Sequence, residues 1–234
     1  MTFCGIHRII SAIILLRLVL RGKEIMTKPY GGIKNIPKYL FEKYGDKGVC
    51  VKRGRSLLMN QMSMEEISGR RTRNCSVVAV TRVMDYYRQT MSLASIPEDI
   101  HELYRQVEEI AESYGYTDKR GTVPLFIAAI TKEAFKQYGI RAKCRGIYIW
   151  SFEKHIVGEI SAGRPLIMNI ARGFYRDHTI VVCGYSIWRV GDKLYPILRV
   201  IDGWNRGIHF LDYESFAKDM SQSIFGSFNT TVIR

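Results

Sequence analysis

Several features that would define a protein class are missing from this chain of 234 residues. Its five cysteines include no CxxC pair, which argues against a zinc site. Their odd number and wide spacing argue against a disulfide framework and fit a reducing compartment. The chain also has no low-complexity run and no internal repeat. We therefore expect one globular domain that needs neither a metal nor another cofactor.

A hydrophobic run long enough to cross a bilayer is also lacking. The segment IISAIILLRLVL, residues 9–20, is too short and contains Arg17, and no small-residue cleavage site follows it. Codons for residues 22–24 would resemble a ribosome-binding sequence just ahead of Met26. We therefore treat 1–25 as a doubtful N-terminal extension or short hydrophobic segment, and 26–234 as the domain. This predicts a cytoplasmic protein without stable membrane insertion; if residues 1–25 are genuine, the alternative is an exported or membrane-associated protein.

Acidic residues are few relative to basic ones. The chain has 35 Lys and Arg against 22 Asp and Glu, a formal net charge of +13. Such a surface favours acidic partners and binds nucleic acid weakly. No helix-turn-helix, zinc-finger or aromatic RNA-binding signature accompanies the charge. We expect a peptide or protein partner, favoured if acidic, and no specific nucleic acid; the oligomeric state stays open.

The hydrophobic pattern predicts helices first and strands afterwards. We expect loop over 49–73, a helix buried on all sides over 76–87, and further helices over 98–114, 122–139 (capped by Thr122) and 151–163 (capped by Ser151). Strand-like runs follow over 140–150, 165–170, 178–185 and 195–204, then a small helix over 209–220 and a closing strand over 227–234. Short connections between strands favour a mainly antiparallel sheet, which is an α+β organisation.

Cys75 stands directly before the apolar run that predicts the buried helix. A free cysteine is often a small hydrophobic core residue. The start of a helix, however, favours the reactive thiolate through the positive end of the helix dipole. Cys144 and Cys183 lie inside predicted strands, and we expect both to be core residues.

Only five histidines are available as partners for this thiol. His178 opens the strand HTIVVCGY after a polar loop, where its ring would face a cleft; His209, between Ile208 and Phe210, is expected to pack. Asp202 ends the next strand, and we expect its carboxylate to accept a hydrogen bond from Nδ1 of His178. The trio Cys75, His178 and Asp202 therefore predicts nucleophilic catalysis by a thiolate.

Four stretches carry a family resemblance: NCSVVAVTRVMDYY, GRPLIMNI, DHTIVVCGY and LRVIDGW. Together they resemble papain-like cysteine peptidases, and C39-like peptidases most closely, over about residues 65–216. The resemblance implies a papain-like fold with N-terminal helices, in which the nucleophile helix is buried against the C-terminal sheet. It also implies that Cys75 is the nucleophile, His178 the general base and acid, and Asp202 the orienting residue. Trp204 would shield the contact between histidine and acid from water.

The chain departs from the family pattern around the oxyanion-binding group. Members commonly have Cys-Gly at the nucleophile, whereas Ser76 follows Cys75 here. Papain-type enzymes have a glutamine six residues before the cysteine, where this chain has Gly69. Gln61 and Asn74 are the candidate oxyanion donors, beside the backbone N–H of Cys75. The loss of one such donor typically costs about 2.7–4 kcal/mol of transition-state stabilisation.

The sequence thus predicts a cysteine peptidase, a hydrolase that acts through a Cys-His-Asp triad and an acyl-enzyme intermediate. Two alternatives stay open: an acyltransferase with the same triad, and a catalytically weak or inactive peptidase-like binding protein. C39 domains that trim bacteriocin leaders are usually fused to transporter and ATPase domains. This chain has neither a P-loop pattern nor a set of membrane helices, so we do not expect that role.

Overall fold

Most of the helices gather at one side of the sheet in the computed structural model, which describes residues 29–220 and 226–233, and the other helices pack on the sheet itself. The helices are α2 (Ile36–Tyr44), α3 (Met64–Ser68), α4 (Cys75–Met91), α5 (Ile100–Ser113), α6 (Ile127–Gln137), α7 (Gly158–Ser161) and α8 (Tyr213–Met220). The strands are β1 (Val49–Arg53), β2 (Ala142–Ile147), β3 (Leu166–Ile170), β4 (His178–Val190), β5 (Lys193–Ile201), β6 (His209–Asp212) and β7 (Ser227–Ile233). This is the α+β organisation that the sequence predicted.

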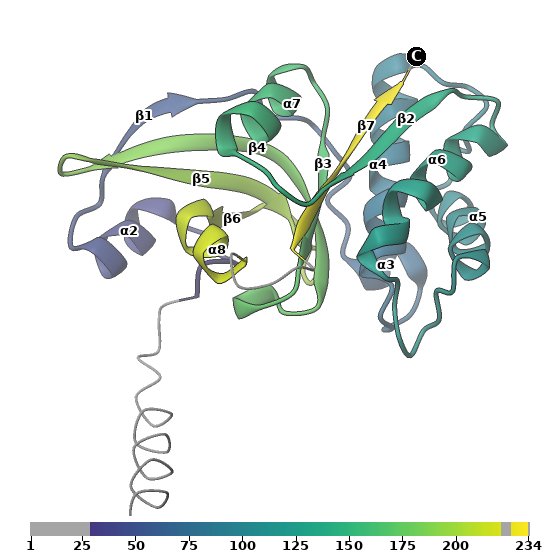
Figure 1. The fold of residues 1–234 in the computed structure, drawn as a ribbon, viewed down its shortest axis with the longest axis horizontal. Helices are drawn as coiled ribbons and strands as arrows, with labels where there is room; N and C mark the ends of the chain where they lie inside the picture. Colours follow the sequence, from purple (N-terminus) through teal and green to yellow (C-terminus); the bar gives the residue numbers. More distant parts are fainter. Residues whose placement is uncertain (1–28, 221–225, 234) are drawn as a thin grey trace, which may run out of the picture.

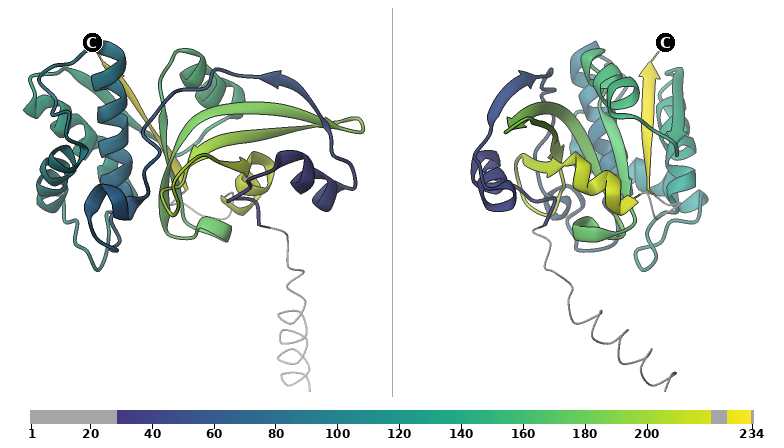
Figure 2. Two further views of the ribbon diagram at one scale, coloured as in Figure 1. Left: turned by 180° about the vertical axis from the view of Figure 1, so that it is seen from behind. Right: turned by 60° about the vertical axis from the view of Figure 1, so that its left-hand side comes forward.

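The strands form one antiparallel sheet in the order β2-β7-β3-β4-β5-β6. Strand β4 is long enough to have two partners along one edge. Its first residues pair with β3, and β1 pairs with its last residues, at Ser186 to Arg189. The hairpin of β4 and β5 therefore extends away from α4 and over α2 (Figures 1 and 2).

Helix α4 joins this group of helices to the sheet. Every residue from Ser76 to Tyr87 is buried, because α5 and α6 cover the helix on one side and strands β3 and β4 on the other. Figure 1 shows α3, α4, α5 and α6 together at one side of the molecule, with the strands beside them. A helix buried all round cannot shift without opening the core. The first residue of α4 is therefore held firmly against the sheet.

A second hydrophobic cluster anchors α2 under the far part of the sheet. At its edge the buried carboxylate of Asp212 accepts hydrogen bonds from the hydroxyls of Tyr39 and Tyr44 and from Nζ of Lys43, at 2.7–2.8 Å. Burial alone would raise the pKa of Asp212, but the lysine and the phenols outweigh it and hold the pKa below its ordinary value. This network ties α2 to β6 and α8.

Two expected segments differ in the structure. The predicted loop over 49–73 contains β1 and α3, and the predicted helix over 209–220 begins with strand β6. Both strands form by pairing with an edge of the sheet, β1 with β4 and β6 with β5. The alternation of polar and apolar residues in their own sequences therefore does not predict them. For α3 a local signal did exist, since Ser63 and Glu66 form a capping box.

Two expected helix caps are also wrong. The hydroxyl of Thr122 is buried without a partner in the described residues, and a tight turn over Pro124–Phe126 precedes α6. Ser151 caps nothing with its side chain; a wide π-type turn over Phe152–Val157 follows it and leads into α7. In both cases an irregular turn precedes the α-helix. The expected capping side chain therefore makes no hydrogen bond to the first N–H groups of that helix.

None of the described helices is both long and apolar enough to cross a bilayer. The hydrophobic segment 9–20 and the proposed start at Met26 lie outside the described residues. The division of the chain into 1–25 and 26–234 stays a prediction.

Candidate active site

Cys75 is the first residue of α4 and is only partly exposed. The residue before it, Asn74, makes no capping hydrogen bond with its side chain. The N–H groups of the first turn are therefore left without their usual side-chain acceptor. An anion beside this helix start, such as a thiolate or a carbonyl oxygen gaining charge, is stabilised by these dipoles.

His178 opens β4 and is buried. Asp177, just before it, has a positive φ of 55°, a left-handed conformation that turns the chain sharply into the strand. The first pair of the β3–β4 ladder is Ile170 with His178, so the imidazole stands at the end of the sheet where α4 begins.

The thiol of Cys75 and the imidazole of His178 interact directly. Burial alone would raise the pKa of the thiol, but the hydrogen bond and charge of His178, with a smaller contribution from Thr179, bring it below the ordinary value. Burial alone would likewise lower the pKa of His178, but Cys75 and the carbonyl of Asp202 outweigh it and raise the pKa. Each group thus favours the charged form of the other, as in a thiolate–imidazolium pair.

The contact between His178 and Asp202 differs from the expected one. Nε2 of the imidazole lies 2.7 Å from the main-chain carbonyl oxygen of Asp202, and the prediction that Nδ1 donates to the carboxylate is wrong. Since a carbonyl can only accept, Nε2 must carry the hydrogen. Nδ1 is then the nitrogen left for Cys75.

The carboxylate of Asp202 has other partners. Its Oδ2 accepts a hydrogen bond of 2.7 Å from the hydroxyl of Tyr175 and lies 3.2 Å from Nδ1 of His209, and its Oδ1 accepts the N–H of Trp204 at 3.1 Å. His209 is buried, and the sequence favoured a packing role for it over a chemical one. The carboxylate therefore shapes the turn whose carbonyl holds His178.

Two aromatic rings flank the imidazole. The indole of Trp204 lies with its centroid 4.9 Å from that of His178 at an interplanar angle of 31°, and the ring of Tyr175 stacks at 5.8 Å. Trp204 is 44% exposed, so it covers the imidazole from the solvent side. Shielding of this kind strengthens the polar contacts behind it by keeping water away.

Arg82, two turns after Cys75 on α4, is a buried cation that sequence reasoning did not single out. Its guanidinium donates to the carbonyl oxygens of Asn60, at 2.6 Å, and Met62. Burial lowers its pKa to about 10, with the charge of Asp202 acting in the opposite direction. An arginine inside an otherwise apolar run was the signal that could have identified it.

The candidate oxyanion donor Gln61 lies between the two residues that Arg82 holds. Its carbonyl oxygen also accepts the N–H of Gly207 at 2.9 Å, and its side chain is exposed. The backbone of Gln61 is thus fixed on both sides while its amide remains free to turn.

Cys75, Arg82 and Asp202 pack around a common point that leaves no room for a water molecule.

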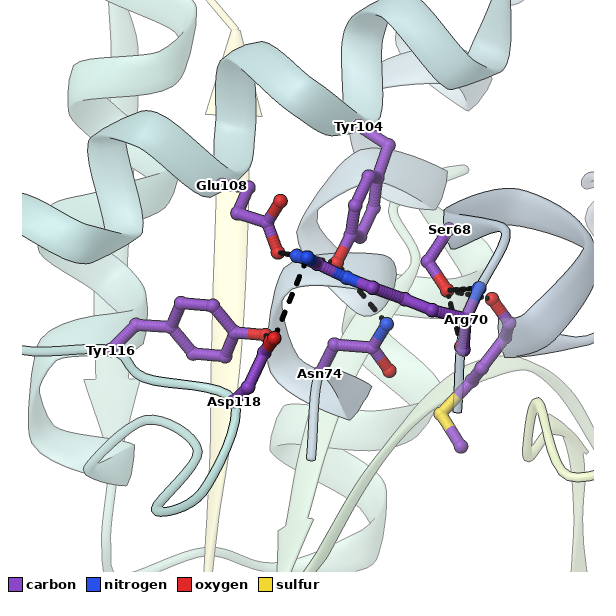
Figure 3. Close-up of polar contacts among 8 residues, drawn as sticks. Ser68, Arg70, Asn74, Tyr104, Glu108, Tyr116 and Asp118 are labelled. Atoms are coloured by element: carbon purple, nitrogen blue, oxygen red, sulfur yellow. Dashed lines mark hydrogen bonds and ion pairs between the residues drawn. The ribbon is translucent and has the colours of Figure 1, made fainter. Parts of the chain in front are cut away.

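The other candidate donor, Asn74, takes part in a network on the helical side of the molecule (Figure 3). Its Nδ2 donates to the hydroxyl of Tyr104 at 3.1 Å, and that hydroxyl donates to Glu108 at 2.7 Å. Arg70 pairs with Glu108 and, at 3.4 Å, with Asp118. The amide of Asn74 therefore fastens the start of α4 to α5, and only its buried Oδ1 lacks a partner in the described residues.

No three His, Cys, Asp or Glu side chains of the described residues gather as the ligands of a metal ion would. The site as it stands therefore consists of a thiol, an imidazole, a main-chain carbonyl and the groups that hold them.

Comparison with known proteins places the chain in a family. The model of the Peptidase_C39 like family matches residues 57–221, which include Cys75, His178 and Asp202. Since this match covers well over half of the chain, the protein belongs to the Peptidase_C39 like family, as the resemblance of its motifs indicated. A search of curated proteins finds no match to the chain.

Proposed function

We propose that this protein is a thiol peptidase with a papain-like arrangement, in which Cys75, His178 and Asp202 act together. The observation that carries the proposal is the position of Cys75, at an uncapped helix start and hydrogen-bonded to His178. The far nitrogen of that imidazole is held by the carbonyl of Asp202. Membership of the Peptidase_C39 like family supports the same conclusion.

In the proposed reaction the Cys75 thiolate attacks the carbonyl carbon of a peptide bond. The carbonyl oxygen gains the negative charge, and the N–H of Cys75 and the amide of Gln61 are the proposed donors to it. The Nδ1–H of His178 then protonates the departing amine as the C–N bond breaks, leaving a thioester. Neutral His178 next takes a proton from water, whose oxygen attacks the thioester carbon; the C–S bond breaks, the carboxylic acid leaves, and the Cys75 thiolate and the His178 imidazolium are restored.

Asp202 and Trp204 have supporting roles in this proposal. The Asp202 carbonyl keeps the hydrogen on Nε2, so that Nδ1 always faces the sulfur, and the carboxylate holds the turn in place through Tyr175 and Trp204. The indole of Trp204 excludes water from the contact between His178 and the carbonyl. The proposed substrate is a peptide or protein, with acidic sequences favoured by the basic surface.

The proposal is tested with an electrophilic peptide probe and a library of unlabelled peptides. Wild-type protein should be labelled at Cys75 and should release new amino termini from peptides, whereas Cys75→Ala should do neither. The matched control is Cys50→Ala, which removes a partly exposed cysteine outside the site and should leave both activities unchanged. Labelling that persists in Cys75→Ala would contradict the assignment.

The same experiment separates the two alternatives. If an added amine captures the acyl group and no hydrolysis product forms, the protein is an acyltransferase. If Cys75 shows neither labelling nor a lowered thiol pKa, the protein is a non-catalytic relative.

A further inference from the structure

A cavity of about 130 Å³ lies on the far part of the sheet, between α2, β1 and the hairpin of β4 and β5. None of the residues of the proposed active site lines it, and its polar lining includes Arg53, Arg199, Ser56 and Ser186. Figures 1 and 2 show β4 and β5 running over α2 in this region, away from α4. The cavity is therefore separate from the site around Cys75.

Arg199 reaches this cavity from the middle of β5. It lies on the same face of the strand as Ile197, two residues earlier, which packs against α2. Gly184 on the neighbouring strand makes room for it, because a Cβ there would lie 3.2 Å from Cδ of Arg199. The aliphatic part of the Arg199 side chain thus passes over β4 at Gly184, which has no side chain to block it.

Arg199 is half-buried, with the thiol of Cys183 beside its guanidinium and no carboxylate. Its Nε is buried and has no hydrogen-bond partner in the described residues. No Asp or Glu lines the cavity, and neither Arg199 nor Arg53 has an ion pair within the described part of the chain. Two cations that share one cavity without a carboxylate repel each other, and an anion between them would relieve that repulsion.

Serine hydroxyls add to the polar part of the lining, beside the apolar side chains of Ile36 and Phe210. Ser186 already accepts the indole N–H of Trp188 at 2.9 Å, so its own O–H is free to donate into the cavity. Ser56 supplies a second hydroxyl. A guanidinium fork and serine hydroxyls together match the acceptor oxygens of an oxyanion, which arginine binds in a bidentate manner.

We propose that this cavity, which we call the Arg53–Arg199 site, binds a small oxyanion, either a phosphate or a carboxylate group. The two guanidiniums would supply the charge, and the hydroxyls of Ser56 and Ser186 would orient the oxygens. This proposal does not depend on the chemistry of Cys75, so it stands or falls separately from the peptidase function.

The test measures binding of inorganic phosphate and of succinate to the full chain at constant ionic strength. The intrinsic tryptophan fluorescence, to which Trp188 in the cavity lining contributes, and the thermal midpoint report occupancy. Wild-type protein should bind at least one of the two saturably. Binding of phosphate alone would identify a phosphate site, and binding of succinate alone a carboxylate site.

Three variants separate the cavity from the general basic surface. Arg199→Met and Arg53→Met should each weaken binding about tenfold or more, the loss expected when a charge-assisted hydrogen bond is removed. Arg53 is exposed, so its variant keeps the test valid if Arg199→Met fails to fold. Arg189→Met removes an exposed arginine of the same strand pair that does not line the cavity, and it should leave binding unchanged.

Two results would overturn the proposal. One is the absence of saturable binding of both anions to the wild-type protein. The other is an equal loss of affinity in Arg189→Met and in the two cavity variants, which would indicate attraction to net charge only.

Discussion

Replacement of His178 by alanine should return the Cys75 thiol to an ordinary or higher pKa. In the native site His178 provides the largest effect that lowers this pKa, against burial that raises it. Without the imidazole, burial is opposed only by Thr179 and the helix start. The variant should therefore form less thiolate than the native protein at the same pH.

The size of the effect follows from the ionised fraction. A thiol with an unperturbed pKa of about 8.5 is roughly 0.3% ionised at about pH 6. If the native thiol is largely ionised at that pH, alkylation of Cys75 should slow by about 10²-fold in His178→Ala. The difference should shrink to a few-fold above about pH 9, where an ordinary thiol also ionises.

The assay is alkylation of Cys75 by iodoacetamide as a function of pH, read by mass spectrometry of the peptide that contains it. Cys144 and Cys183 serve as internal controls, because burial raises the pKa of each to about 11 and both should stay unlabelled in folded protein. His155→Ala, which removes a histidine of the turn before α7, should leave the profile unchanged. Superposable Cys75 profiles in wild type and His178→Ala would refute the reasoning.

Three further predictions concern the groups around the site and the anchor of α2. Asp202→Asn should reduce kcat for peptide hydrolysis only about tenfold, because a main-chain carbonyl holds His178 here. Where a triad carboxylate sets the histidine tautomer, the same change lowers kcat by ~10⁴-fold, and a loss of that size here would contradict the reasoning. Gln61→Ala should lower kcat by about 10²–10³-fold with little change in KM, while Gln61→Glu should not rescue it; unchanged kcat would exclude the donor role. Asp212→Asn should lower the free energy of unfolding by about 3–5 kcal/mol in urea titrations, because it leaves the cation of Lys43 without its charge partner. Since the folded pKa of Asp212 is lowered, this contribution should be present above about pH 4 and be lost as the pH falls through the folded pKa; a difference that persists in acid would contradict it.

Much of the fold could be predicted because its signals are local. The start of α4 at Cys75 is encoded by the apolar run that follows it, and α5 begins beside its cap at Asp99. Strands β3, β4 and β5 appear where Val- and Ile-rich runs alternate or are buried on both faces. Strands β1 and β6 escaped prediction because their stability comes from the edges on which they pair, and not from their own residues.

The candidate site also has features that local sequence predicts and others that depend on the tertiary structure. Residue types and their order in the chain were enough to select Cys75, His178 and Asp202, since a helix start, a strand start and a strand end are local features. Which atom of Asp202 meets the imidazole depends on the turn after β5, and that turn is held by Tyr175, 27 residues earlier in the chain. No local pattern could supply that contact.

The sequence by itself determined the α+β class, the buried helix behind Cys75 and the family to which the chain belongs, because hydrophobic period and short motifs are properties of neighbouring residues. Only the tertiary structure decided that a carbonyl and not a carboxylate holds His178, that Arg82 holds the segment around Gln61, and that Arg199 lies in a cavity without a carboxylate. These contacts join residues far apart along the chain, and their energies arise from burial and geometry that exist only once the sheet and helices have packed together.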